Sequence, residues 1–302
     1  MAADSRSSAP GESDAAGRPA GGTEPKIVLH DVHKSFGPKR VLDGVDLSVA
    51  AGEALVVIGA SGTGKSVMLK HIIGLLRPDS GSVVVDGVAV EKLGNREITE
   101  FRRRFGMAFQ EGALFDSMTV WENVAFPLKR LSKKSPREIR ERVEECLAMV
   151  RLEGVGPRMP SELSGGMRRR VGFARAVAHE PEILLFDEPT TGLDPVTTAL
   201  IGEVIRDLGK RLETTSVTIT HDMDIAFGIA DRIAMLDRGK VIAEAPPAEF
   251  RELSDPRVQQ FIHGEAQGPL TETLEHGDPA TRATPATRAT PATPANKGGL
   301  RP

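Results

Sequence analysis

The sequence of 302 residues predicts an α/β fold, and two observations carry this prediction. First, short apolar runs typical of strands alternate along the chain with segments of helical periodicity. Second, several of these runs are apolar throughout, which is typical of strands that are covered on both faces of a sheet. The predicted strands are Ile27–Leu29, Leu55–Ile58, Val83–Val85, Ile183–Phe186, Val217–Ile219 and Ile233–Leu236.

The stretch from about residue 111 to residue 161 departs from this alternation. Between Pro136 and Val150, apolar residues recur at intervals of three or four positions among charged ones, which predicts an amphipathic helix. We therefore expect a mostly helical insertion within the α/β core.

Both ends of the chain have compositions that disfavour a packed core. Residues 1–25 are rich in Ala, Gly, Ser and Pro and have almost no large apolar groups, which predicts a disordered arm. Near the other end the hexapeptide ATRATP occurs twice, at Ala280–Pro285 and Ala286–Pro291. This low-complexity tail is too short and too polar to form a repeat fold.

Composition excludes several classes of function. The net charge of −3 gives no basic excess for binding phosphate backbones, so we expect no nucleic acid partner. The single cysteine, Cys146, can form neither an internal disulfide nor a cysteine-rich zinc site, which fits a reducing cytosol. The sequence contains no apolar run long enough to span a membrane, and its first 25 residues lack the charged-then-apolar order of a secretory signal, so we expect no export signal. Any membrane association is therefore expected to depend on a partner that spans it.

A glycine-rich motif, G-x-x-x-x-G-K-[ST], occurs at Gly59–Ser66. It follows the predicted strand Ala54–Ile58 and precedes a predicted helix at Ser66–Leu75, which is the context that phosphate binding requires. The alternative, an accidental glycine-rich turn, is expected in roughly a few per cent of chains and becomes rarer with these flanks. We predict that Lys65 contacts the β- and γ-phosphates and that Ser66 is a ligand of Mg²⁺. The nucleotide-binding residues predicted here are Gly59, Ala60, Ser61, Gly62, Thr63, Gly64, Lys65, Ser66 and Val67.

Two adjacent carboxylates end another apolar strand, in the sequence Ile183–Glu188. At a strand end Asp187 is placed to hold Mg²⁺, and Glu188 is placed to accept a proton from an attacking water. The alternative is an exposed acidic turn before Pro189, and the phosphate-binding motif argues against it.

A third motif, Leu163–Met167, reads LSGGM and precedes an apolar-periodic stretch. By itself it indicates a capped helix with a flexible entry. Together with GASGTGKS upstream and ILLFDE downstream, it resembles the signature of ABC-type ATPases. The resemblance runs from about Lys26 to Gly264 and implies a phosphate-loop core with an antiparallel β subdomain. It places an ATPase domain at residues 26–264, with its helical part at about 111–161, and a C-terminal extension and tail at residues 265–302.

Four further positions match this family in order. The resemblance implies that Phe36 stacks on adenine, where most members have Tyr, and that Gln110 links Mg²⁺ and the attacking water to a membrane partner. It also implies that Asp194 lies in a loop that crosses to a second subunit and that His221 contacts the γ-phosphate. A lone Gln or His is more often an unremarkable surface or core residue. Met167 departs from the Gln found in many members, and we expect activity to survive this change.

The family resemblance also implies an assembly. Two copies of the chain are expected to sandwich two ATP molecules, each bound by the phosphate loop of one copy and the signature of the other. Ser164, Gly165 and Gly166 then form a second helix-start anion site for the γ-phosphate. A degenerate ATP-binding scaffold is disfavoured, because Lys65 and the residues predicted for catalysis are present.

Among ABC proteins, the sequence favours a transport ATPase. The chain has one phosphate loop, one cysteine and no sustained heptads, unlike the translation-factor, DNA-repair and chromosome-maintenance types. Two stretches, Phe109–Lys129 and Asp255–Leu270, look like those of the Mla/Mce lipid-transport ATPases. The resemblance implies a permease, a STAS-domain protein and an MCE lipid-binding protein as partners, at the cytoplasmic face of the inner membrane. The alternative is the ATPase of another importer, for amino acids or osmolytes.

The first of these stretches borders Gln110, where the family receives the coupling helix of the permease. Leu114, Phe115, Met118 and Trp121 are candidates for that socket. The alternative for each is that it packs the helical insertion against the core.

Overall fold

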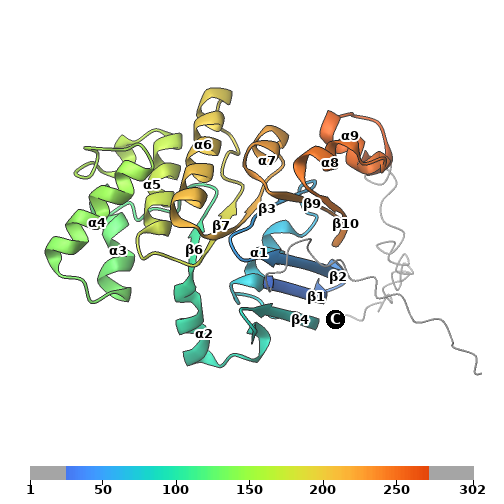
Figure 1. The fold of residues 1–302 in the computed structure, drawn as a ribbon, viewed down its shortest axis with the longest axis horizontal. Coiled ribbons are helices and arrows are strands. Elements are labelled where there is room, and N and C mark those ends of the chain that lie inside the picture. Colours follow the sequence, from blue (N-terminus) through green and yellow to red (C-terminus); the bar gives the residue numbers. More distant parts are fainter. Residues whose placement is uncertain (1–24, 272–302) are drawn as a thin grey trace, which may run out of the picture. The chain divides into compact units, whose positions relative to one another are not determined.

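The computed structural model describes residues 25–271 (Figure 1). The chain divides into two compact units, Met1–Ser254 and Asp255–Pro302. The predicted disordered arm, apart from Pro25, and the repeats at Ala280–Pro291 lie outside the described residues. The proposed domain limits remain predictions.

The central element of the first unit is a six-stranded sheet in the order β10-β9-β3-β8-β7-β6. Its strands are parallel except for the edge strand β10, which pairs antiparallel with β9. The strands are β3 (Ala54–Ile58), β6 (Phe105–Ala108), β7 (Ile183–Asp187), β8 (Thr215–Ile219), β9 (Arg232–Asp237) and β10 (Lys240–Ala245). The predicted strands of this sheet are confirmed, and their apolar runs are buried because helices cover the sheet.

A second sheet is antiparallel and has the order β2-β1-β4-β5, as the family resemblance implies. Its strands are β1 (Pro25–Phe36), β2 (Lys39–Ala50), β4 (Ser80–Val85) and β5 (Val88–Ala89). The strand β2 is missing from the strands that the sequence predicts. Its buried Val45, Leu47 and Val49 alternate with polar residues, so they form no apolar run.

Helices α3 (Val120–Leu131) and α4 (Pro136–Met149) pack with α5 (Gly165–Val177), and Figure 1 shows them beside one another at one side of the first unit. The helix predicted at Pro136–Val150 is confirmed. It begins where it does because the Ser135 side chain accepts from the Glu138 N–H while the Glu138 carboxylate accepts from the Ser135 N–H. The other helices are α1 (Lys65–Ile72), α2 (Asn95–Phe101), α6 (Pro195–Leu212), α7 (Met223–Ile229), α8 (Pro247–Glu252) and, in the second unit, α9 (Pro256–His263), with short 3₁₀ turns at Val90–Lys92, Arg102–Arg104 and Pro160–Glu162.

The first unit has two buried apolar clusters. One joins α3, α4, α5 and α6 to β7, and the Phe173 ring on α5 meets the Phe186 ring edge-on with centroids 5.3 Å apart. The other fills the space around α1 between the two sheets. Phe186 immediately precedes Asp187, so the first cluster fixes the strand end that carries the two carboxylates.

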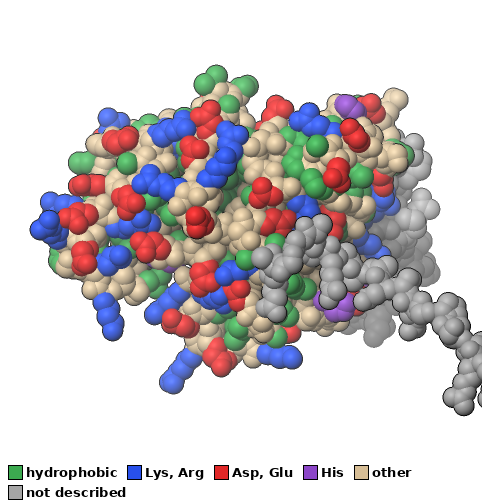
Figure 2. All heavy atoms as spheres, in the orientation of Figure 1, with side chains coloured by type: hydrophobic (Ala, Val, Ile, Leu, Met, Phe, Trp, Pro, Cys, Tyr) green, Lys and Arg blue, Asp and Glu red, His purple; other side chains and the backbone are tan. Residues whose placement is uncertain are grey.

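Charge is mixed on the face of the molecule that Figure 2 shows. On the face shown in Figure 2, Lys and Arg side chains are interspersed with Asp and Glu outside the grey region. This distribution agrees with the net charge of −3 and gives that face no basic stripe.

Candidate active site

The loop of residues 59–66 joins the end of β3 to the start of α1, at the carboxyl edge of the six-stranded sheet. Gly59 has a φ of 147°, and a Cβ added there would lie 2.2 Å from the carbonyl oxygen of Leu236. Gly64 has a φ of 110°, and its Cβ would lie 2.8 Å from a methyl carbon of Leu42. Only glycine allows both this backbone conformation and this close approach.

The same loop presents donors to its interior. Its turn is closed by the Thr63 hydroxyl, which donates to the Ala60 carbonyl over 2.9 Å. The helix α1 begins at Lys65, and the first N–H groups of a helix have no partner within it. These N–H groups, with the positive end of the helix dipole, suit the oxygens of a phosphate chain.

The Lys65 side chain lies inside this loop and is only 6% exposed. Its ammonium group donates to the carbonyl oxygens of Gly59, over 2.7 Å, and Ala60, over 3.1 Å. The Glu188 carboxylate lies 3.6 Å away. Burial lowers the pKa of Lys65, and the charges of Glu188 and Asp187 oppose this shift. The ammonium group is thus held among oxygens where phosphate oxygens would also bind.

Ser66 and Asp187 bring a hydroxyl and a carboxylate together beside the loop. The Ser66 hydroxyl, in the first turn of α1, donates to the carboxylate of Asp187 at the end of β7 over 3.1 Å. Burial raises the pKa of Asp187, the hydrogen bond from Ser66 lowers it, and the neighbouring Glu188 raises it further. Among residues 25–271, no group of three or more His, Cys, Asp or Glu forms a metal site. One hydroxyl and one carboxylate fit Mg²⁺, which takes few protein ligands and completes its shell with water and phosphate oxygens.

Glu188 is held by contacts on both of its carboxylate oxygens. One oxygen lies 2.7 Å from the His221 Nδ1 and accepts from the Thr191 hydroxyl over 3.1 Å, while the other faces Lys65. The backbone of Glu188 has a φ of 48°, an uncommon conformation for a residue with a side chain. Its N–H nevertheless donates to the Ile219 carbonyl over 3.0 Å, which anchors the turn.

The parallel sheet explains why these residues meet. The strands β7 and β8 are neighbours, and Asp187 is paired with Ile219. The residues that follow the two strands therefore emerge at the same edge, next to the loop that follows β3. This brings Lys65, Glu188 and His221 together although they are far apart in the sequence.

The other predicted site residues have contacts of different kinds. Within residues 25–271, no hydrogen bond or ion pair joins Phe36, Gln110, Ser164 or Asp194 to the loop of residues 59–66. The Phe36 ring is 48% exposed at the end of β1, with the Lys34 ammonium group 5.8 Å from its centroid. Gln110 is exposed in the loop that follows β6.

Ser164 and Asp194 begin two helices that touch. The Ser164 side chain caps α5 by accepting from the Met167 N–H over 3.3 Å, and the Asp194 side chain caps α6 by accepting from the Thr197 N–H over 3.0 Å. A Cβ on Gly166 would lie 2.4 Å from a methyl carbon of Thr197. The second glycine of the signature therefore allows the starts of the two helices to approach closely.

Two residues that the sequence patterns do not single out contribute to this region. Thr191 donates to Glu188, as described above, and Arg169 contacts the backbone of Gln110 and of Thr191. The run of three arginines at residues 168–170, in an otherwise apolar-periodic helix, is the sequence signal that could have identified Arg169.

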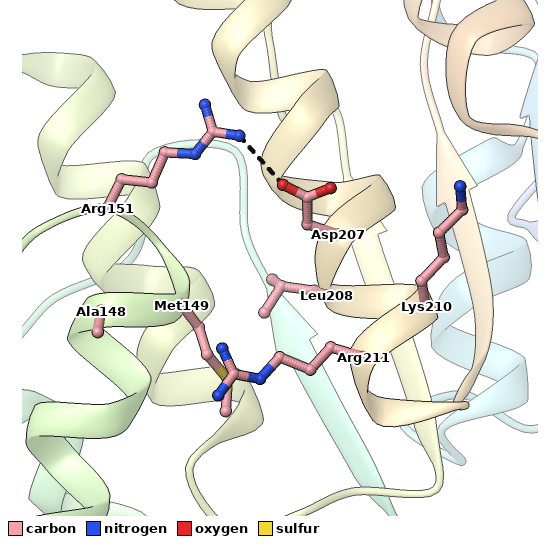
Figure 3. A pocket seen from close by; sticks show the side chains of 7 residues that line it. All are labelled: Ala148, Met149, Arg151, Asp207, Leu208, Lys210 and Arg211. Carbon is pink, nitrogen blue, oxygen red and sulfur yellow. Dashed lines mark hydrogen bonds and ion pairs between the residues drawn. The ribbon is translucent and has the colours of Figure 1, made fainter.

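A separate hollow of about 490 Å³ lies between the end of α4 and the second half of α6 (Figure 3). The Arg151 guanidinium forms ion pairs with the carboxylates of Asp207, at 3.1 Å, and Glu203, at 2.8 Å, and so joins the two sides of the hollow. No residue of the loop 59–66 lines it, and its α6 residues lie at the far end of that helix from Asp194. The hollow is therefore separate from the candidate active site.

Proteins that combine such a sheet and loop with an acidic pair at the end of another strand of the same sheet are phosphate-loop nucleoside triphosphatases, and the fold and site place this chain among them. Its fold is similar to that of the ATP-binding cassette MJ0796, solved as a dimer bound to ADP and phosphate. The TM-score is 0.68 at 36% identity, and the match covers 73% of this chain and 98% of that one.

Residues 42–191 match the protein family described as ABC transporter. Over 257 residues the chain is 43% identical to the probable ribonucleotide transport ATP-binding protein mkl of Mycobacterium tuberculosis. This match covers 85% of this chain and 71% of that protein. It is 41% identical over 234 residues to the intermembrane phospholipid transport ATP-binding protein MlaF of Haemophilus influenzae, and this match covers 78% of this chain and 89% of that protein. It is 42% identical over 261 residues to the methionine import ATP-binding protein MetN of Caulobacter vibrioides, and this match covers 85% of this chain and 78% of that protein. The chain belongs to the ATP-binding proteins of ABC transporters, and it is an ATPase.

Proposed function

We propose that this chain is the ATP-hydrolysing subunit of a bacterial ABC transporter that moves phospholipid, or another hydrophobic substrate, across the cell envelope. The observation that carries the catalytic part is the contact of Glu188 with both Lys65 and His221 at the edge where the phosphate loop opens. The identity to MlaF, which extends over 89% of that protein, supports the lipid part.

In the proposed reaction, the loop of residues 59–66 holds the phosphates and Lys65 contacts the β- and γ-oxygens. Glu188 takes a proton from the water that attacks the γ-phosphorus, and the bond from that phosphorus to the bridging oxygen breaks. Asp187 and Ser66, with Gln110, are the proposed ligands of Mg²⁺, which would neutralise charge on the phosphate oxygens. His221 is proposed to contact the γ-phosphate.

A second copy of the chain is the proposed partner for catalysis. Ser164, Gly165 and Gly166 form a helix start that no hydrogen bond joins to the loop 59–66 of the same chain within the described residues, so they are free to serve the nucleotide of another copy. The dimeric form of the MJ0796 cassette supports this arrangement. Phe36 has an exposed ring face for adenine, and Asp194 lies beside the signature.

The proposed membrane partner is a permease that docks near Gln110. Phe109 and Phe115 are each 41% exposed there, whereas Leu114 and Trp121 pack against the apolar cluster of the helical part. None of the helices in residues 25–271 combines the length and apolar character of a membrane span. A place on the cytoplasmic face of the inner membrane would therefore depend on the permease, and a STAS-domain protein and an MCE protein are the proposed further partners.

The test is to purify the chain with its permease in detergent, identify co-purified lipid by mass spectrometry, and then measure ATPase activity. We expect bound phospholipid and an activity that depends on Glu188. The alternative, an importer of amino acids or osmolytes, is supported by the 42% identity to MetN. Activity that responds to a soluble binding protein with its small ligand, and no bound lipid, would establish the alternative.

A further inference from the structure

Arg169 lies in α5, two residues after the signature, and its side chain is almost fully buried. The residue is 7% exposed. Its Nε donates to the carbonyl oxygen of Gln110 over 2.5 Å, and its Nη2 donates to the carbonyl oxygen of Thr191. These carbonyls lie in two different loops, so one guanidinium group joins both loops to α5.

Each of the joined segments carries a residue of the proposed site. Gln110 is the proposed link between Mg²⁺ and the membrane partner. The Thr191 hydroxyl donates to the carboxylate of Glu188, and Asp194 follows in the same loop. The helix that carries Arg169 is capped by Ser164, the proposed contact to the second nucleotide. Arg169 is therefore the point at which three parts of the site meet.

The loop after Gln110 lies directly on the backbone of α5. A Cβ on Gly172 would lie 3.0 Å from the Cα of Gly112, and a Cβ on Gly112 would lie 2.7 Å from the carbonyl oxygen of Arg168. Arg175, one turn further along α5, donates to the Gly112 carbonyl over 2.9 Å. Because there is no space between them, this loop and α5 are expected to move together.

The burial of the Arg169 guanidinium costs free energy that a residue with only a packing role would not need to spend. Within residues 25–271 no carboxylate forms an ion pair with it, and its buried Nη1 has no hydrogen-bond partner. Leaving such a donor unsatisfied costs free energy, and burying a charge without an opposite charge beside it adds to this cost. Burial lowers the pKa of Arg169, while the charge of Glu111 raises it. An apolar side chain at this position would avoid both costs.

We propose that Arg169 is a positioning residue for ATP hydrolysis, which ties the loops of Gln110 and Thr191 to the signature helix so that the three move as one unit. This inference rests on the proposed roles of Gln110, Glu188 and Ser164. It assigns to Arg169 no contact with the nucleotide.

Arg142 on α4 provides a matched control. It is 8% exposed, and its guanidinium also donates to two backbone carbonyls, those of Ala178 over 3.1 Å and Val177 over 3.0 Å. These carbonyls lie at the end of α5 opposite the signature. The variants Arg169→Met and Arg142→Met each remove a buried guanidinium and two carbonyl hydrogen bonds while keeping a long side chain. Arg142→Met also removes ion pairs with Glu145, at 2.7 Å, and Glu180, at 3.6 Å, so its effect on stability should be at least as large.

The experiment uses the full chain and measures the melting temperature, kcat, KM for ATP, and ATP-dependent dimer formation in a Glu188→Gln background. We expect Arg169→Met to lower kcat roughly tenfold, with little change in KM, and to weaken the dimer. We expect Arg142→Met to lower the melting temperature at least as much and to leave kcat within about twofold of the wild type. Arg169→Lys, which keeps the charge and one donor group, should restore part of kcat.

Equal kcat values for the two methionine variants would overturn the inference, since Arg169 would then contribute only to stability. If Arg169→Met does not fold, Arg169→Lys carries the test: a lowered kcat at an unchanged melting temperature supports the positioning role, and an unchanged kcat overturns it. The same set of variants also tests the proposed function, through the rate of ATP hydrolysis by Glu188→Gln. A Glu188→Gln protein that hydrolyses ATP at the normal rate refutes that function whatever the Arg169 variants do.

Discussion

Replacing Glu188 with Gln is the sharpest test of the proposed chemistry. The change keeps the size of the side chain and one carbonyl oxygen, which can still accept from the Thr191 hydroxyl and face His221. It removes the negative charge that lies 3.6 Å from the Lys65 ammonium group. A neutral amide cannot take a proton from water, so the variant loses the proposed base and little else.

The expected size of the effect follows from these contacts. Removing a positioned general base typically costs about 10²- to 10⁴-fold in rate, which corresponds to roughly 3–5 kcal/mol in the activation barrier. ATP binding should be retained or strengthened, because Lys65 loses a competing carboxylate and keeps the carbonyl contacts to Gly59 and Ala60. Binding without hydrolysis should keep two copies together in ATP.

Three measurements check this prediction. Phosphate release gives kcat, titration with a fluorescent ATP analogue gives affinity, and size-exclusion chromatography with and without ATP gives the dimer. Glu180→Gln is a suitable control, because Glu180 is an exposed carboxylate beside Arg142 that contacts no residue of the site. A normal rate of phosphate release by Glu188→Gln would refute the assignment of the base.

The other predictions concern phosphate binding, acid stability and the thiol. Lys65→Ala should weaken ATP affinity by about tenfold or more, since the only buried ammonium group of the described loop is lost, and unchanged affinity would count against its role. Hydrogen bonds from Arg104, joined by those from Lys26, lower the pKa of Glu182 from 4.5 to about 2. Its contribution to stability is therefore present above about pH 4.5 and lost as the pH falls towards 2, and acid unfolding of Glu182→Gln should lack this component. Burial raises the pKa of Cys146 to about 11, so a thiol reagent at pH 8 should label the unfolded chain and not the folded one, and rapid labelling of the folded chain would contradict the burial.

The strands of the parallel sheet were predictable because covered strands have apolar runs that can be read locally. The helix α4 was predictable for a similar reason, since its periodicity and its capping residues Ser135 and Glu138 lie within one segment. The strand β2 was missed because its apolar residues alternate with polar ones, and β6 because Gly106 interrupts its apolar run. Strands of these kinds are specified by their neighbours in the sheet more than by their own sequence.

The sequence by itself determined the phosphate loop, because the requirement for Gly59 and Gly64 is steric and local, and it placed Asp187 and Glu188 at a strand end. Only the tertiary structure decided that Glu188 lies between Lys65 and His221, since this depends on the order of β3, β8 and β7 in the sheet. The same holds for Arg169, whose carbonyl partner in Gln110 lies 59 positions away along the chain. Such contacts leave no periodic trace in the sequence, because they depend on how distant segments pack and not on the conformation of any one segment.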